Sequence, residues 1–93
     1  MVSEQVVVTN EKGFHLRPAG NLCKEALLFK SSIQIVNGTR TGNAKSMLSV
    51  LSVCVKCGDE ITVICDGEDE QEALQDLLRL IRGGLTDELL TKQ

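Results

Sequence analysis

The chain has 93 residues, of which 42% are hydrophobic and 25% are charged, and its only aromatic residues are two phenylalanines. This length and composition are typical of one small globular domain with an aliphatic core. No apolar run approaches the roughly 20 residues needed to cross a bilayer, the N-terminus lacks the basic start and apolar stretch of a signal peptide, and the net charge of −3 argues against direct binding to nucleic acid. We therefore expect a cytoplasmic protein without membrane insertion, whose four cysteines are free thiols.

The charge is unevenly distributed along the chain. Residues 1–56 carry seven Lys/Arg and three Asp/Glu, whereas residues 57–93 carry three Lys/Arg and ten Asp/Glu. The basic part includes the only histidine, His15. A phosphate group and acidic partner proteins both suit such a surface.

The first half of the chain predicts a strand, a helix and a hairpin. Residues 2–9 are rich in β-branched side chains and predict a strand. Residues 18–29 predict a helix, because apolar residues recur at intervals of three and four. Residues 32–36 alternate in polarity, Asn37-Gly38 is a favoured two-residue turn, and residues 39–42 complete the hairpin.

The second half predicts a short helix over residues 46–53, a strand over residues 60–66 and a longer final helix. Asp69 and Glu72 have the spacing of a capping box at the start of this last helix, and Gly83-Gly84 are expected to end it with a left-handed C-cap. A single domain is thus expected over residues 1–84. The tail, residues 85–93, forms either a short extra helix or a frayed end.

The predicted order is β-α-β-β-α-β-α. The hairpin requires antiparallel strands, so we predict an α+β fold. It is an open-faced β-sandwich, in which a four-stranded antiparallel sheet is covered on one face by three helices. Pattern alone leaves the strand order open, and a ferredoxin-like arrangement has nearly the same order of elements.

The most informative residue is His15, in the segment Gly13-Phe14-His15-Leu16-Arg17-Pro18-Ala19. Proline is favoured at the first helical position, so we expect His15 at the mouth of a helix, where unpaired N–H groups and the helix dipole attract anions. Arg17 adds a fixed cation. These features predict a site for a phosphoryl group, and the alternative is an ordinary surface or capping histidine.

Two motifs resemble a known family. Gly13-x-His15-x-Arg17-Pro18-Ala19 is similar to the active-site motif of HPr, the histidine phosphocarrier of the bacterial sugar phosphotransferase system. Asn43-x-Lys45-Ser46 resembles the regulatory-serine segment of the HPr proteins of Gram-positive bacteria. The resemblance covers residues 1 to about 84.

The resemblance implies a carrier that needs no cofactor or metal and is not a turnover enzyme. It implies that enzyme I phosphorylates His15 on Nδ1, that Arg17 stabilises the phosphoryl group, and that an enzyme IIA domain receives it. It further implies that an HPr kinase/phosphorylase modifies Ser46. Phosphoserine at that position hinders transfer and favours binding to a catabolite-control transcription factor. Ser46 is also a favourable N-cap for the second helix.

The resemblance also places the partner surface around His15, and we expect a monomer that presents this surface to successive partners. Leu27 lies off the apolar stripe of the first helix, and the second helix has apolar residues that can form an exposed ridge. Leu48 and Leu51 are alternatively core residues. The expected partner-binding residues are Leu16, Gly20, Lys24, Leu27, Met47, Leu48 and Leu51.

Several positions depart from the family pattern and leave open a divergent, HPr-like regulatory paralogue that acts mainly through phosphoserine 46. Cys54 stands where glycine is common, and so does Ser49. Gly20 lies inside the first predicted helix. A redox or metal module built on Cys54 and Cys57 is a third alternative, although one C-x-x-C pair lacks the further ligands of a tetrahedral zinc site.

Overall fold

The structure, a computed structural model, describes residues 1–91. The predicted order of elements is confirmed, with one short 3-10 helix added near the C-terminus. The elements are β1 (Val2–Val7), α1 (Leu16–Ala26), β2 (Ser32–Asn37), β3 (Arg40–Asn43), α2 (Met47–Ser52), β4 (Glu60–Asp66), α3 (Glu70–Arg82) and the 3-10 helix η1 (Asp87–Leu89).

The four strands form one antiparallel sheet in the order β1-β4-β2-β3, which the element order alone had left open. In this arrangement β4 lies between β1 and β2, so that Cys65 pairs with Val2 on one side and with Ile33 on the other. Asn37 pairs with Arg40, so the two-residue turn between β2 and β3 is Gly38-Thr39, and the predicted Asn37-Gly38 turn is wrong by one residue. Gly38 has a positive φ of +64°, as the first central residue of a type II′ hairpin turn requires.

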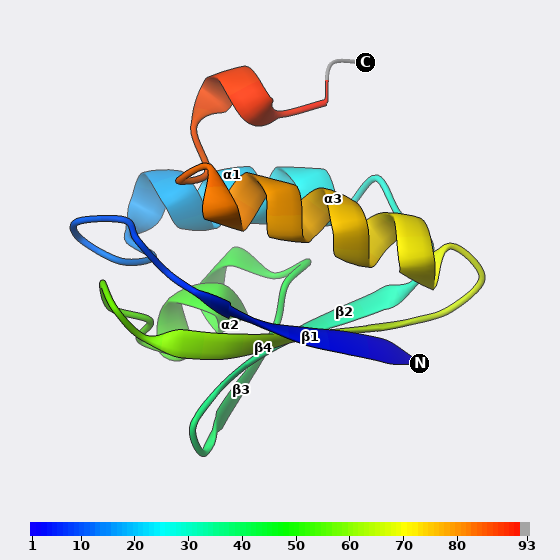
Figure 1. Cartoon of the computed structure of the whole chain (residues 1–93), viewed down its shortest axis with the longest axis horizontal. Coiled ribbons are helices and arrows are strands. Elements are labelled where there is room, and N and C mark those ends of the chain that lie inside the picture. The colour runs from blue at the N-terminus through cyan, green and yellow to red at the C-terminus, as the bar shows by residue number, and fades with distance from the viewer. Residues whose placement is uncertain (92–93) are drawn as a thin grey trace.

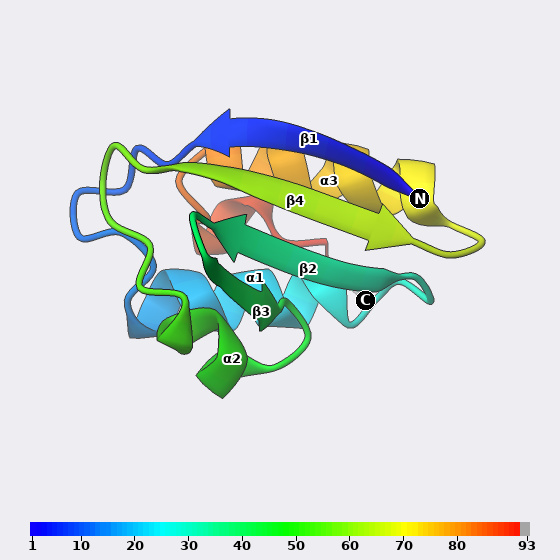
Figure 2. The same ribbon diagram turned by 90° about the horizontal axis from the view of Figure 1, so that it is seen from below.

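Helices α1 and α3 lie side by side on one face of the sheet, and α2 lies next to β3, where it packs against α1 (Figures 1 and 2). The core lies between these layers. The sheet contributes alternate residues and the helices contribute their apolar stripes, as predicted. The main core residues are Val6, Ile33, Ile35, Ile61, Val63, Cys65, Ala19, Leu22, Ala26, Leu74, Leu77, Leu78 and Ile81. No helix within residues 1–91 is long and apolar enough to span a membrane.

The bounds predicted for α1 were wrong at both ends. The helix begins at Leu16 and Pro18 is its third residue; proline is tolerated there because the first N–H groups of a helix have no intrahelical acceptor in any case. The helix ends at Ala26, since the following backbone N–H groups of Leu28 and Phe29 bond three residues back, to Glu25 and Ala26.

The capping box predicted for α3 is also wrong. Asp69 is the N-cap residue, but its carboxylate makes no capping bond. It accepts hydrogen bonds from the backbone N–H groups of Lys30 and Ser31, both at 2.9 Å, and from the Ser31 hydroxyl. These donors belong to the α1–β2 loop, which tertiary folding brings to the start of α3. The hydrogen bonds from Ser31 and Lys30 lower the pKa of Asp69 to about 2.

The end of α3 matches the prediction. Gly84 has a φ of +84°, Leu85 N donates to Leu80 O at 2.8 Å, and Gly84 N donates to Ile81 O at 3.1 Å. This is the Schellman pattern of a left-handed C-cap. Residues 85–91, called the C-terminal segment below, then turn back over the helices, and Leu85 is fully buried. Of the predicted tail, residues 92–93 lie outside the described part.

Candidate functional site

His15 is the N-cap residue of α1, with an extended backbone (φ −81°, ψ −167°). Its side chain makes no capping hydrogen bond and is exposed. The imidazole is therefore accessible from solvent and is not used to cap the helix.

The start of α1 leaves hydrogen-bond donors beside His15. The first helical bond of the 11-residue helix runs from Ala19 N to His15 O at 3.0 Å, so the N–H groups of Leu16 and Arg17 have no intrahelical acceptor, and Pro18 has no N–H. No side chain within the described residues caps these donors. The positive end of the helix dipole adds to them, and together they form a place that favours an anion.

The loop before His15 is held against the connection between α2 and β4. Phe14 is buried, and its N–H donates to Val55 O at 3.0 Å. Gly13 has a φ of +64°, and a Cβ at this position would lie 2.1 Å from Val55 O. Glycine is therefore needed at position 13 both for its backbone conformation and for this close approach. The loop thereby holds His15 in place.

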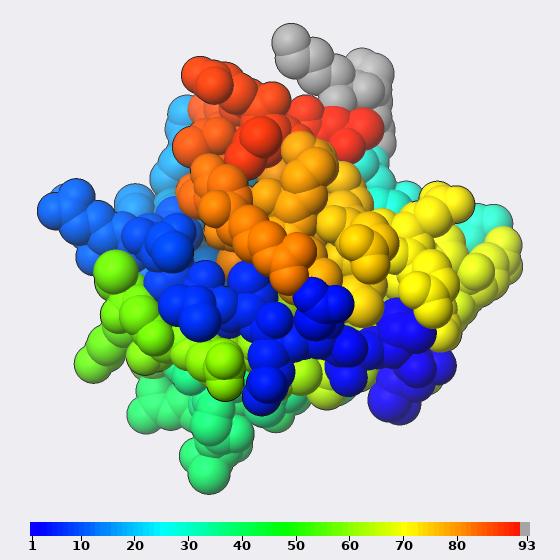
Figure 3. All heavy atoms as spheres, in the orientation of Figure 1, coloured from blue at the N-terminus to red at the C-terminus, as the bar shows by residue number. Residues whose placement is uncertain are grey.

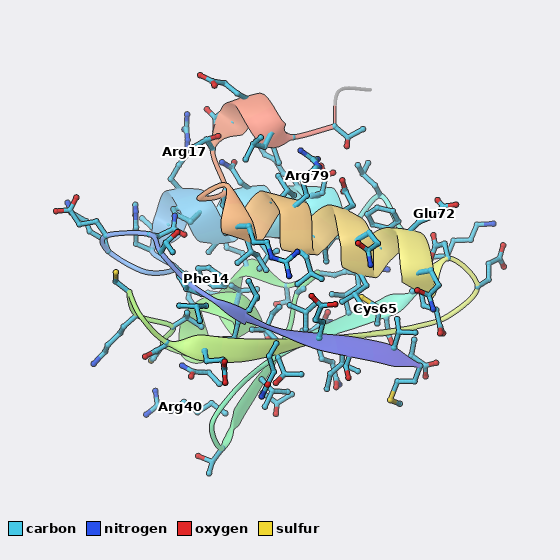
Figure 4. All side chains as sticks on the ribbon, viewed as in Figure 1. Phe14, Arg17, Arg40, Cys65, Glu72 and Arg79 are labelled. Carbon is cyan, nitrogen blue, oxygen red and sulfur yellow. The ribbon has the colours of Figure 1, made fainter. Side chains whose placement is uncertain are left out.

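The Arg17 side chain points to the C-terminal segment (Figure 4). It forms a two-pronged ion pair with Asp87, in which Arg17 Nε donates to Oδ1 at 3.2 Å and Nη2 donates to Oδ2. Asn21 Nδ2 also donates to Asp87 Oδ1, at 2.8 Å. The hydrogen bond from Asn21 and then the one from Arg17 lower the pKa of Asp87. Sequence reasoning missed Asp87, because no local pattern links a tail carboxylate to a residue 70 positions away.

Comparison with known families identifies the family of this chain. Residues 2–83 match the family described as "PTS HPr component phosphorylation site". The chain belongs to the HPr family. It is 40% identical to the phosphocarrier protein HPr of Mycoplasma capricolum over 75 residues, which cover 81% of this chain and 84% of that protein. It is 38% identical to the HPr-like protein Crh of Bacillus subtilis over 82 residues, which cover 88% of this chain and 96% of that protein.

Solved HPr structures have the same fold. The crystal structure of HPr-C-His from Thermoanaerobacter tengcongensis superposes with a TM-score of 0.88 at 30% identity, covering 91% of this chain and 96% of that chain. The HPr dimer from the same organism superposes with a TM-score of 0.74 at 30% identity, covering 94% and 100% of the two chains. The predicted open-faced sandwich is thus confirmed as the HPr fold.

The segment that resembles the regulatory-serine motif of HPr proteins forms a tight turn into α2. Asn43 Oδ1 accepts from Lys45 N at 2.9 Å, and Asn43 O accepts from Ser46 N at 3.0 Å. Ser46 is the N-cap of α2, as predicted, and its half-buried Oγ accepts from Ser49 N at 3.3 Å. The Ser49 hydroxyl in turn accepts from Asn43 N at 2.7 Å, so a glycine at position 49 would lack this contact.

The structure divides the expected partner-binding residues into two groups. Leu16, Leu27 and Leu48 are exposed, at 66%, 61% and 81% of their surface, and Lys24 is exposed as well. The other three residues are half-buried in the packing of α1 and α2. A Cβ on Gly20 would lie 3.8 Å from Met47 Cε, and Leu51 packs against the core.

The cysteines are free thiols in different surroundings. Cys54 and Cys57 are exposed, and Cys65 is buried in the core. Burial raises the pKa of the Cys65 thiol to about 11. Within residues 1–91 no group of three or more His, Cys, Asp or Glu side chains is placed to hold a metal ion.

Proposed function

We propose that this protein is a phosphocarrier that accepts a phosphoryl group on His15 from phosphorylated enzyme I and passes it to a sugar-specific enzyme IIA domain. The observation that carries the proposal is an exposed imidazole at the uncapped start of α1, in a chain whose family is named for a phosphorylation site. The role is that of a phosphorylated intermediate, without a cofactor and without turnover of a substrate of its own.

The chemistry follows from the donors around His15. A neutral imidazole has a free electron pair on one ring nitrogen, which we assign to Nδ1, and this nitrogen attacks the phosphorus atom. The bond between phosphorus and the donor atom of enzyme I breaks as the new N–P bond forms, and the electron pair of the broken bond stays with the donor. Such transfer needs mainly positioning and charge stabilisation. The N–H groups of Leu16 and Arg17 supply both, and the Arg17 guanidinium adds its charge.

Partner binding in this proposal uses the exposed residues around the site. Leu16, Leu27 and Leu48 offer apolar contacts, and Lys24 attracts an acidic partner. The protein acts as a cytoplasmic monomer, since one face must meet successive partners. Because one solved relative is described as an HPr dimer, light scattering on a size-exclusion column tests this part. A mass of twice 10.1 kDa contradicts it.

Regulation through Ser46 is the second part of the proposal. Phosphorylation by an HPr kinase/phosphorylase adds about −1.5 to −2 charges, which repel an acidic enzyme I surface. The modified protein then binds a catabolite-control transcription factor. The similarity to Crh, described as an HPr-like protein, favours a second candidate, a regulatory paralogue that acts mainly through phosphoserine 46. The presence of His15 favours the carrier.

The test is intact mass spectrometry after incubation with enzyme I, magnesium and phosphoenolpyruvate, beside His15→Ala. We expect one added phosphoryl group that is acid-labile and absent from His15→Ala. No added mass, with an enzyme I that labels a known HPr, refutes the carrier. Incubation with ATP and an HPr kinase, beside Ser46→Ala, then tests the regulatory candidate.

A further inference from the structure

In the unphosphorylated protein, the Asp87 carboxylate is bound to the Arg17 guanidinium. A guanidinium binds carboxylates and phosphates through the same planar pair of N–H groups. Arg17 donates two such bonds to the two oxygens of Asp87. If Arg17 stabilises a phosphoryl group on His15, as proposed above, that group uses the same N–H donors, so the two anions compete for one cation.

The position of Asp87 is built into the fold. Leu85, two residues earlier, is fully buried, and its carbonyl oxygen accepts from Asn21 Nδ2 at 2.8 Å. The same amide group also holds Asp87 Oδ1 at 2.8 Å. Farther along, Leu89 O accepts from Arg79 Nη2 at 2.8 Å. The C-terminal segment is therefore fastened on both sides of Asp87.

The segment lies over α1 and α3 (Figure 3). At its far end the Glu25 carboxylate, on α1, accepts from Thr91 N at 2.9 Å and from Thr91 Oγ1 at 2.7 Å. Directly before the segment, Gly84 O accepts from Asn10 Nδ2 at 2.7 Å. None of these contacts involves Arg17, so the segment that carries Asp87 is held over α1 by other residues as well.

We propose that Asp87 is a positioning residue for Arg17, which it holds in the unphosphorylated protein and yields to the phosphoryl group on His15. The inference rests on the proposed function of His15. Competition by Asp87 makes phosphorylation of His15 less favourable and onward transfer more favourable. The C-terminal segment thereby tunes the phosphoryl-transfer potential of the carrier.

The size of the effect follows from the exposure of the pair. The two side chains are 74% and 54% exposed, and pairs of this kind contribute little in water. We expect removal of the Asp87 charge to raise the equilibrium constant for phosphorylation of His15 by about twofold to fivefold.

The experiment measures that equilibrium constant with catalytic enzyme I at a fixed ratio of phosphoenolpyruvate to pyruvate. The phosphorylated fraction is read by intact mass. Asp87→Asn removes the charge and keeps the shape, and its amide oxygen can still accept the hydrogen bond from Asn21 Nδ2. Glu88→Gln is the matched control, because it removes the same charge from the neighbouring residue, which makes no ion pair within the described part of the chain. Asp87→Asn should raise the constant, and Glu88→Gln should leave it within about 1.4-fold of the original value.

A second pair of variants shows whether Asp87 acts through Arg17. In an Arg17→Ala background, Asp87→Asn should no longer change the equilibrium constant, whereas a general charge effect would persist. Equal effects of Asp87→Asn and Glu88→Gln, or a lower constant for Asp87→Asn, overturn the inference while leaving the carrier function intact. Failure of the unsubstituted protein to be phosphorylated on His15 overturns the proposed function and this inference with it.

Discussion

Replacement of Cys54 by glycine should stabilise the protein. Cys54 has a φ of +54°, in the left-handed region, directly after the turn that ends α2. An L-residue with a Cβ pays roughly 1–2 kcal/mol for this conformation. The side chain is exposed, so little packing is lost when it is removed. The cysteine is accepted here because its neighbour Val55 is buried and holds the loop that carries His15.

The expected gain is the difference between two terms. Glycine relieves about 1–2 kcal/mol of backbone strain, but it raises the conformational entropy of the unfolded chain, which costs about 0.4–1 kcal/mol. The net increase in the free energy of unfolding therefore lies between about 0 and about 1.6 kcal/mol, with a central value of about 0.8 kcal/mol. For a domain of this size, 1 kcal/mol corresponds to a rise of about 4–8 °C in melting temperature.

The assay is urea denaturation in the presence of a reducing agent, followed by circular dichroism. Cys57→Gly is the matched control, because Cys57 is also exposed and lies in the same loop, but its φ is not positive. This variant gains no relief of strain and should lose about 0.4–1 kcal/mol. If Cys54→Gly is no more stable than Cys57→Gly, the strain argument is refuted.

Three further predictions concern other positions. Gly20→Ala should raise the free energy of unfolding by about 0.5–1 kcal/mol, because the new Cβ meets only Met47 Cε, at 3.8 Å; a loss of stability in urea contradicts this. The hydrogen bonds that lower the pKa of Asp69 to about 2 stabilise the fold above the unfolded pKa of about 4, so stability should fall as the pH drops from about 4 to about 2. Asp69→Asn should lack this part of the pH dependence. If the variant and the unsubstituted protein have the same acid-unfolding profile, this prediction is wrong. The buried Cys65 thiol, whose pKa is raised to about 11, should react with a thiol reagent only after unfolding. The exposed thiols of Cys54 and Cys57 should react in the native protein. Fast reaction of Cys65 in the native protein contradicts this prediction.

Features that depend on local periodicity were predictable from the sequence. The alternation of Ile61, Val63 and Cys65 predicted which face of β4 is buried, because successive strand residues point to opposite faces. Gly84 predicted the end of α3, since its left-handed conformation is cheap only for glycine. The placement of His15 at a helix start followed from the proline nearby, although the helix begins two residues earlier than predicted.

Features that join distant parts of the chain required the tertiary structure. The spacing of Asp69 and Glu72 indicated a capping box, but the folded chain offers the Asp69 carboxylate better donors in the loop at Ser31. The strand order and the half-burial of Leu51 likewise depend on how layers pack.

The sequence by itself determined the order of elements, the buried faces and the residue proposed to carry the phosphoryl group, since each depends on neighbours within a few positions. Only the tertiary structure decided what Arg17 binds. Its partner Asp87 lies 70 residues away and reaches it because Leu85 is buried and Asn21 holds the segment in place. Such a contact depends on the geometry of the whole fold, which no local pattern of residues encodes.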